Sequence, residues 1–213
     1  MKDYQKEFLG YAIELGAIRF GEFTLKSGRI SPYFFNTGLF NSGTKLARLG
    51  KYYAAAAIDA NLEFDMLFGP AYKGIPLSVT TAIAFDEVYN QDVPCAFNRK
   101  EAKQHGEGGV VIGAPLKGKV LIIDDVISSG ISARQAADLI QANGAQTAGI
   151  IIALNRQEKG SNKSSAVQEI EELLGINVTS IVGLDTLADY MAHCGGFEAE
   201  LVAINRYRDQ YGC

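Results

Sequence analysis

The chain has 213 residues, of which 47% are hydrophobic and 21% are charged, and its formal net charge is −4. This length can bury a full hydrophobic core without disulfides or structural metals, so we expect one domain over residues 1–213. An acidic chain is a poor general binder of nucleic acid, because that affinity depends on neutralising phosphates.

The termini and the cysteines give no sign of export or membrane insertion. The first residues lack the apolar run of a signal peptide, and no apolar stretch approaches the roughly 20 residues of a membrane span. Three widely spaced cysteines form neither a disulfide framework nor a metal-ligand pattern. We therefore expect a cytoplasmic protein that binds neither nucleic acid nor membranes.

Hydrophobic periodicity predicts helices that alternate with short apolar strands. The clearest strand is KVLIIDD, residues 119–125, which is apolar on both faces as in a buried parallel sheet. The alternation predicts an α/β fold, a central parallel sheet flanked by helices, with residues 1–40 contributing to a small hood. In the first half of the chain we expect a helix over 3–18, short strands over 20–40, a helix over 43–61, a strand over 64–69, a helix over 75–89 and a strand over 93–99. An exposed loop over 100–109 should follow. In the second half we expect strands over 119–125, 147–154 and 177–183, alternating with helices over 132–143, 163–174, 184–193 and 197–211.

The end of strand 119–125 carries the strongest functional signal. In an open α/β sheet, ligands bind beyond the carboxyl ends of the strands, and Asp124 and Asp125 lie at such an end. The loop that follows contains three serines and Gly130 and leads into a helix, whose first N–H groups attract anions. A phosphate cradle beside two carboxylates that can bind hydroxyls indicates a ribose 5-phosphate site; the alternative is a plain helix cap.

Basic residues elsewhere also point to phosphate. Lys73 lies in a glycine-bounded turn after strand 64–69, and Arg156 follows strand 147–154. A further basic cluster on a glycine-rich segment suggests a mobile lid over a polyphosphate. Taken alone, Lys73 is equally compatible with a solvated loop, whereas the cluster and Arg156 favour an exposed, solvated position. The cluster consists of Arg99, Lys100, Lys103 and His105.

Two nucleotide-binding motifs are excluded. The segment Gly113–Lys119 nearly spells a nucleoside-triphosphate P-loop, but it lacks the final Ser or Thr and precedes a strand instead of following one. No Gly-x-Gly-x-x-Gly follows a strand, so a dinucleotide-binding fold has no support.

At these residues the sequence resembles the bacterial orotate phosphoribosyltransferases, a family of the type I phosphoribosyltransferases. VLIIDDVISSGIS matches the phosphoribosyl-pyrophosphate (PRPP) signature of type I enzymes. FGPAYKGIP, FNRKEAKQHGEGG and LKSGRISPYFFNTG are similar to the pyrophosphate loop, mobile loop and N-terminal hood of the orotate family. The last three segments are the more specific ones, and the resemblance runs from the first helix to the C-terminus.

The resemblance implies transfer of ribose 5-phosphate from PRPP to N1 of orotate, giving orotidine 5′-monophosphate and pyrophosphate in de novo pyrimidine (UMP) biosynthesis. It implies a Mg²⁺ cofactor held mainly through PRPP, a cis peptide between Ala71 and Tyr72, and a homodimer whose mobile loop reaches the neighbouring site. The implied catalytic residues are Lys73, Lys103, His105 and Asp125. The implied PRPP-binding residues are Lys26, Tyr72, Lys73, Arg99, Lys100, Lys103, His105, Asp124, Asp125, Val126, Ile127, Ser128, Ser129, Gly130, Ile131 and Ser132. The implied orotate-binding residues are Lys26, Phe34, Phe35, Ser128 and Arg156.

Two rival functions are weaker. A phosphoribosyltransferase for a purine or for uracil would not need Arg156 as a cationic anchor, since an uncharged base has no carboxylate. A non-catalytic regulator that binds PRPP and nucleic acid should show a basic face, which an acidic chain does not favour. The phosphate loop carries serines where the family commonly has threonines, so we expect altered affinity with the same function.

Overall fold

The computed structural model describes residues 1–25, 27–103, 109–160 and 164–213. Its centre is a six-stranded sheet in the order β5-β4-β3-β6-β7-β8, in which β5 runs antiparallel to β4 and the other neighbours are parallel. The predicted α/β class with a central parallel sheet is confirmed. The strands are β3 (Met66–Gly69), β4 (Cys95–Lys103), β5 (Gly109–Gly113), β6 (Lys119–Asp124), β7 (Gln146–Asn155) and β8 (Val178–Gly183).

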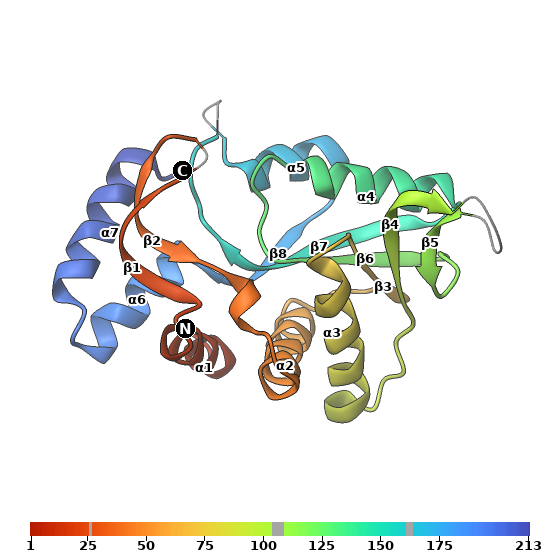
Figure 1. Ribbon diagram of the computed structural model, residues 1–213, viewed down its shortest axis with the longest axis horizontal. Helices are drawn as coiled ribbons and strands as arrows, with labels where there is room; N and C mark the ends of the chain where they lie inside the picture. Colours follow the sequence, from red (N-terminus) through yellow and green to blue (C-terminus); the bar gives the residue numbers. More distant parts are fainter. Residues whose placement is uncertain (26, 104–108, 161–163) are drawn as a thin grey trace.

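Helices cover both faces of this sheet, as Figure 1 shows. Central strand β6 explains why, because its side chains alternate between two hydrophobic clusters. Leu121 and Ile123 belong to the cluster under α2 (Gly43–Asp59) and α3 (Gly74–Tyr89). Val120 and Ile122 belong to the cluster under α4 (Ile131–Ala142) and α5 (Ala166–Leu174). In the described part of the chain, no helix combines the length and apolarity needed to cross a membrane.

A separate two-stranded sheet, β1 (Ile18–Thr24) with β2 (Ile30–Phe35), forms the hairpin that we call the hood. The hood lies beside α7 (Glu198–Tyr211), so an early hairpin packs against the last helix of the chain (Figure 1). The ring centroid of Phe20 on β1 is 5.6 Å from that of Phe197, which begins α7. The C-terminal helices α6 (Leu184–Cys194) and α7 therefore support a hairpin that lies about 170 residues earlier in the sequence.

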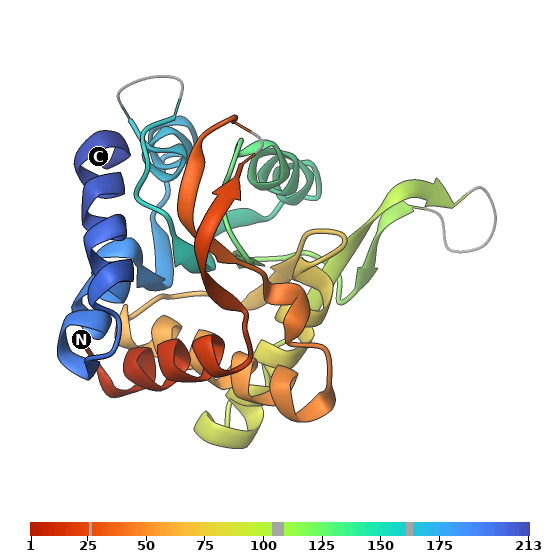
Figure 2. The ribbon, with the colours of Figure 1, turned by 60° about the vertical axis from the view of Figure 1, so that its left-hand side comes forward.

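Two predicted elements differ from the structure. The first helix, α1 (Asp3–Glu14), ends before the expected residue 18 because Gly16 takes a left-handed φ of +69° and Ile18 begins β1. The predicted loop 100–109 is wrong for residues 100–103 and 109, which extend β4 and β5 into a hairpin that projects from the body (Figure 2). Backbone pairing between these strands, such as Lys103 with Gly109, needs no apolar pattern. Residues 104–108 lie outside the described residues.

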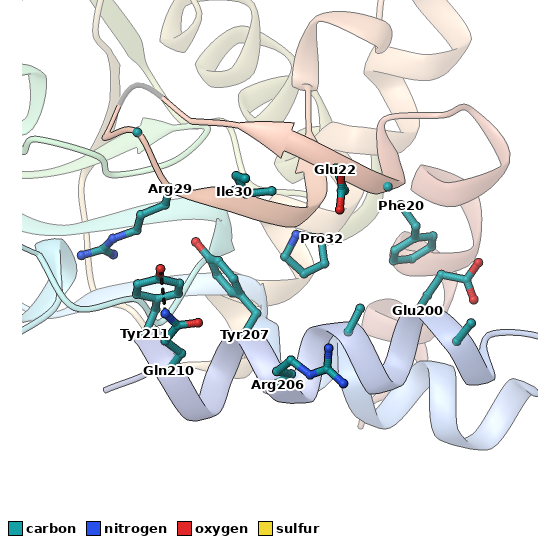
Figure 3. Close-up of a pocket in the computed structure, with 14 residues that line it drawn as sticks. Phe20, Glu22, Arg29, Ile30, Pro32, Glu200, Arg206, Tyr207, Gln210 and Tyr211 are labelled. Carbon is teal, nitrogen blue, oxygen red and sulfur yellow. Dashed lines mark hydrogen bonds between the residues drawn. The ribbon is translucent and has the colours of Figure 1, made fainter.

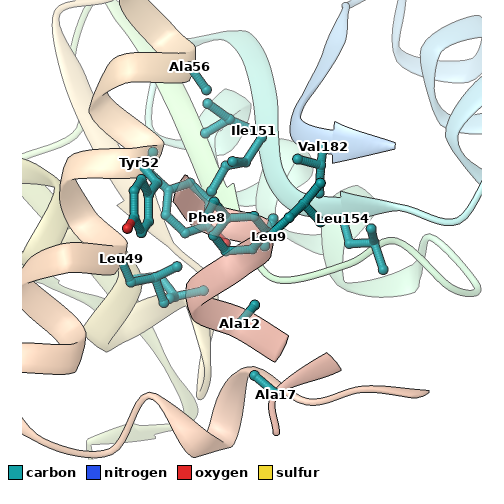
Figure 4. Close-up of a cluster of buried hydrophobic side chains, with 14 of the residues drawn as sticks. Phe8, Leu9, Ala12, Ala17, Leu49, Tyr52, Ala56, Ile151, Leu154 and Val182 are labelled. Carbon is teal, nitrogen blue, oxygen red and sulfur yellow. The ribbon is translucent and has the colours of Figure 1, made fainter. Parts of the chain in front are cut away.

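Phe8 on α1 joins the hood to the main core (Figure 4). Its side chain is fully buried, and its ring lies 6.3 Å from the rings of Phe35 and Phe40 and 5.6 Å from that of Tyr52. The four rings come from α1, β2, the short helix η1 (Thr37–Leu39) and its C-cap, and α2. Aromatic packing at this point fixes the place where the hood leaves the sheet domain.

Phe8→Ala should lower the free energy of unfolding by about 3–5 kcal/mol, because it empties the centre of the four-ring cluster. Chemical denaturation measures this loss. Leu173→Ala on α5 is the control, since that side chain is 58% exposed and its truncation should cost little. Similar losses in the two variants would show that Phe8 does not join the hood to the core.

Candidate active site

The candidate site lies at the carboxyl edge of the parallel strands. Strand β6 ends at Asp124, β3 ends at Gly69 and β7 ends at Asn155, so the segments that follow these strands meet at one edge of the sheet. These segments carry most of the residues expected from the sequence, and the hood brings a further set toward the same edge.

Asp125 connects three of these segments. Its Oδ2 accepts hydrogen bonds from Lys73 Nζ at 2.6 Å and from Thr37 Oγ1 at 2.8 Å, while Oδ1 accepts from the backbone N–H of Val126 at 3.0 Å. The residue is only 7% exposed, whereas the Lys73 side chain remains 59% exposed. Asp125 is thus a buried carboxylate with a donor at each oxygen, and Lys73 keeps much of its surface open to solvent.

The carboxylate of Asp124 has fewer hydrogen-bond donors than that of Asp125. Its Oδ1 accepts from the backbone N–H of Asp125 at 2.9 Å, and the hydroxyl of Ser132 lies 3.4 Å from Oδ2. Burial, and then the negative charge of Asp125, raise the pKa of Asp124 to about 6. The backbone carbonyl of Asp124 accepts from the buried Tyr53 hydroxyl at 2.8 Å, which fixes the strand end. One oxygen of Asp124 therefore has room for a further hydrogen-bond donor.

The segment after Asp125 forms a tight turn into α4. Gly130 takes a φ of +69° at the N-cap position, a conformation that favours glycine, and Ile131 begins the helix. The backbone N–H groups of the first turn have no partner within the helix, and such groups can donate to an anion. Three exposed serines provide hydroxyls on the same loop: Ser128, Ser129 and Ser132.

Val126 and Ile127 do not present their side chains to this turn. Val126 packs against the hydrophobic cluster on one face of the sheet, and Ile127 packs against the cluster on the other face. A small cavity of about 50 Å³ lies against the loop, and both residues contribute to its lining. Any contact that they make with a phosphate comes chiefly from the backbone.

The turn between β3 and α3 brings the backbone close to itself. A Cβ atom at Gly69 would lie 2.1 Å from the carbonyl oxygen of Gly74, so this position accepts only glycine. The Ala71–Tyr72 peptide bond is cis, as the family resemblance implied. The backbone N–H of Ala71 donates to Asn98 Oδ1 at 2.8 Å, so β4 holds the turn that presents Tyr72 and the following lysine.

Arg156 follows Asn155 at the end of β7 and is held on three sides. Its Nη2 lies 2.6 Å from Glu158 Oε1 and donates to Ser31 Oγ at 3.1 Å. Its guanidinium carbon lies 4.5 Å from the ring centroid of Tyr33. Arg156 therefore joins the sheet edge to strand β2 of the hood and presents a fixed, partly buried cation there.

The two hood phenylalanines lie on opposite faces of β2, as neighbours in a strand must. The ring of Phe34 stacks on Phe23 at 5.5 Å, with the Arg19 guanidinium 5.9 Å from its centroid. The ring of Phe35 meets Phe8 in the core. The two rings cannot both face one ligand from the same side of β2, so shared contact with a planar base must use the backbone of at least one of them.

The predicted lid residues are described only in part. Arg99 is half-buried on β4. Lys100 and Lys103 lie on the projecting part of the same strand. His105 and the hood residue Lys26 lie outside the described residues.

Three residues of the site were missed by sequence reasoning. Thr37 and Asn98 hydrogen-bond Asp125 and Ala71, and Glu158 pairs with Arg156. Thr37 stands inside the hood motif quoted above, so its position offered a signal. Asn98 likewise stands inside the quoted segment FNRKEAKQHGEGG, but its contact with Ala71 comes only from the tertiary fold. Glu158 lies two residues after Arg156, and no motif singled it out.

A larger cavity of about 670 Å³ lies on the other side of the hood, between the hairpin and α7 (Figure 3). Its walls include Phe20 and Pro32 from the hairpin and Arg206 and Tyr207 from α7. None of the described residues that the sequence predicted for the site lines it. The site chemistry therefore belongs to the carboxyl edge, where the described residues hold no cluster of three or more His, Cys, Asp or Glu side chains that could bind a metal.

A mostly parallel sheet with an acidic pair and a glycine-bearing phosphate loop at its carboxyl edge defines a phosphoribosyltransferase. The family described as "Phosphoribosyl transferase domain" matches residues 40–189. The orotate phosphoribosyltransferase of Pseudomonas aeruginosa is 57% identical over 212 residues, covering 100% of both chains, and that of Shewanella oneidensis is 54% identical, covering 100% of this chain and 99% of its own. The crystal structure of the Francisella tularensis orotate phosphoribosyltransferase is 39% identical, with a TM-score of 0.88, and covers 97% of this chain and 100% of its own. The chain belongs to the orotate phosphoribosyltransferase family.

Asp124→Asn should stabilise the ligand-free protein at pH 8 more than at pH 4. The pKa of about 6 in the folded state lies above the value of roughly 3.9 in an unfolded chain, so the folded site favours the protonated acid. Its stabilising effect is complete below pH 4 and is lost as the pH rises through 6, and the ionised form then costs about 3 kcal/mol.

Thermal denaturation at the two pH values measures the effect. Asp138→Asn, on the exposed side of α4, makes the same charge change away from the acidic pair and serves as the control. If the melting temperature of Asp124→Asn changes equally at pH 4 and pH 8, the carboxyl group is not destabilised by its surroundings.

Proposed function

We propose that the protein transfers ribose 5-phosphate from PRPP to N1 of orotate, releasing pyrophosphate and forming orotidine 5′-monophosphate for de novo pyrimidine (UMP) biosynthesis. One observation carries this proposal: the acidic pair and phosphate loop at the end of β6 face the same sheet edge as the fixed cation Arg156. The first set suits the ribose phosphate, and the cation suits the orotate carboxylate.

In this proposal, PRPP binds along the edge from α4 to α3. The N–H groups and serine hydroxyls of the turn before α4 bind the 5-phosphate, with backbone contacts from Val126 and Ile127. Asp124 and Asp125 accept hydrogen bonds from the ribose hydroxyls, and the free capacity of Asp124 supports this role. Tyr72 and Lys73 meet the pyrophosphate from the β3–α3 turn.

The reaction breaks an anomeric C–O bond through an oxocarbenium-like transition state, so the leaving pyrophosphate gains negative charge. Lys73, with its ammonium group already directed to Asp125, is placed to stabilise that charge. Arg99, Lys100 and Lys103 would add positive charge from β4, with His105 as a further cationic group, and closure over the site would keep water from the cationic sugar.

The acidic pair also fits a Mg²⁺ ion held mainly by PRPP. Both oxygens of Asp125 already accept hydrogen bonds, and Asp124 leaves only one oxygen without a short contact to the described residues. A protein cage for the ion is thus absent from the described residues, and the oxygens of PRPP must supply most of its ligands. When bound, Mg²⁺ would neutralise charge on the pyrophosphate.

Orotate would lie between the hood and the sheet edge. Arg156 binds its carboxylate, with Lys26 as a second cation and Ser128 as a hydroxyl donor. Phe34 and Phe35 border the base, one with its ring and the other with its backbone, because their side chains lie on opposite faces of β2. Breakage and formation of the glycosidic bond need no side-chain nucleophile.

A homodimer would bring the projecting hairpin to a neighbouring site. The residues at positions 72, 76, 79 and 83 are apolar and exposed, and their spacing places them on one side of α3 and the turn before it. This face continues from the pyrophosphate turn, and the β4–β5 hairpin extends beside it beyond the sheet (Figure 2). A second copy seated on the face would bury it and receive the hairpin.

We place this enzyme in the cytoplasm. Its three cysteines form no disulfide in the structure, since Cys95, Cys194 and Cys213 all carry free thiols. Free thiols are compatible with a reducing compartment.

A mixture of the protein with PRPP, Mg²⁺ and orotate should lose orotate absorbance and produce pyrophosphate in equal amount. Arg156→Met should raise the KM for orotate by roughly 100-fold, because it removes a charge-assisted pair with the carboxylate. The steady-state assay is run in parallel with uracil, adenine and hypoxanthine. Consumption of one of these bases, with orotate unchanged, would refute the assignment.

Ile83→Asp should convert the dimer to a monomer and remove most of the activity, because it puts a charge into the apolar face that the second copy covers. Size-exclusion chromatography with light scattering gives the mass, and the orotate assay gives the activity. Val202→Asp on α7 is the control, since that side chain is similarly exposed but lies on another surface. A fully active monomer would exclude a shared site, and an intact dimer would exclude this face.

A further inference from the structure

Glu158 lies at a junction of three parts of the molecule. It follows β7 two residues after Arg156, faces Arg29 and Tyr33 of the hood, and forms a backbone bridge with Gly212 beyond α7. Its side chain is only 12% exposed, although it carries a full negative charge in the ionised form. A buried carboxylate at such a junction requires partners for both of its oxygens.

The two oxygens of Glu158 meet two different arginines. Oε1 lies 2.6 Å from Arg156 Nη2 and 3.5 Å from the Tyr33 hydroxyl, while Oε2 lies 4.0 Å from Arg29 Nη1. Arg29 is itself fixed, since it donates to the backbone carbonyl of Lys159 at 2.7 Å and packs over the Tyr211 ring, with 4.8 Å between guanidinium carbon and ring centroid. Figure 3 shows Arg29 beside Tyr211 at the C-terminal end of α7.

The contacts of Arg156 with Glu158 and Ser31 both use Nη2. The Tyr207 hydroxyl also lies close to both Arg156 and Glu158. The ring of Tyr33 covers the guanidinium plane. A guanidinium held at one end and stacked on a ring keeps a fork of donors for a second carboxylate.

We propose that Glu158 is a positioning residue that holds Arg156 in the orientation that receives the carboxylate of orotate. The proposal rests on the function proposed above. An arginine side chain has many rotamers, and ordering it in advance removes that entropic cost from substrate binding. Glu158 supplies the order from the side of the guanidinium that the substrate does not use.

The negative charge of Glu158 opposes this benefit, because it repels a second carboxylate. The repulsion is offset by the surrounding cations: Arg156 and Arg29 carry two positive charges against the single negative charge of Glu158. The cluster therefore keeps a net charge of about +1 and still attracts an anion. Positioning should outweigh repulsion, so removal of the Glu158 charge should weaken orotate binding.

The test is Glu158→Gln, which keeps the size of the side chain and removes its charge. We expect the KM for orotate to rise roughly tenfold, as for loss of one charge-assisted hydrogen bond, with the KM for PRPP within about twofold. Glu158→Asp, which retains the charge, should restore part of the loss. Glu172→Gln on the exposed side of α5 is the matched control and should leave both constants unchanged.

A double-variant cycle separates positioning from a general structural role. In an Arg156→Met background, Glu158→Gln should raise the KM for orotate no further, because the residue acts through Arg156. Ser31→Ala removes the other acceptor of Nη2 without a charge change and should raise the same KM several-fold, which provides a second test if Glu158→Gln folds poorly.

An unchanged or lower KM for orotate in Glu158→Gln would overturn the proposal, as would equal increases for both substrates or additive effects in the cycle. Those outcomes leave the proposed function intact as long as the unmodified chain consumes orotate. An unmodified chain that consumes no orotate would instead refute the function itself, and the role of Glu158 with it.

Discussion

The buried carboxylate of Asp125 is the contact on which the geometry of the site depends. It receives Lys73 from the β3–α3 turn and Thr37 from η1, which follows the hood, and it lies just beyond the end of the buried strand β6. These three segments are separated by 36 and 52 residues along the chain. A single acidic group therefore holds the β3–α3 turn, the end of β6 and the segment after β2 in register, and its loss would release all three.

The acidic pair and the turn after it show how an acidic protein could bind a polyanion in the proposed function. Asp124 and Asp125 repel each other, and burial makes the repulsion costly, which raises the pKa of Asp124. In the proposed function, ribose hydroxyls would donate to the carboxylates and offset that cost. The phosphate groups would meet backbone N–H groups at the start of α4, which carry partial positive charge without changing the net charge of the chain.

The hood depends on both ends of the chain. Phe8 anchors it to the sheet domain, and α7 supports its outer side through Phe20 and Phe197. Arg29 and Arg156 then meet at Glu158, so the cation proposed for the orotate carboxylate is fixed from the hood and from the sheet at the same time. Rigid support of this kind suits a residue that must recognise a planar, charged base.

The sequence by itself determined the alternation of strands and helices, the two-faced strand that ends at Asp124 and the phosphate turn after it, because these features depend on neighbouring residues and on hydrophobic periodicity. It also identified Lys73 and Arg156 as cations that follow strands. Tertiary structure alone decided that Thr37 reaches Asp125 and Asn98 reaches Ala71, because these partners are far apart in the sequence. It also decided that Glu158 meets both Arg156 and Arg29 of the hood. It likewise decided that polar residues 100–103 form a strand, since backbone pairing with β5 replaces the apolar pattern that sequence reasoning requires. Strand geometry places the side chains of Phe34 and Phe35 on opposite faces of β2. Only the position of Phe8 in the tertiary structure decides that the Phe35 ring is the one that enters the core.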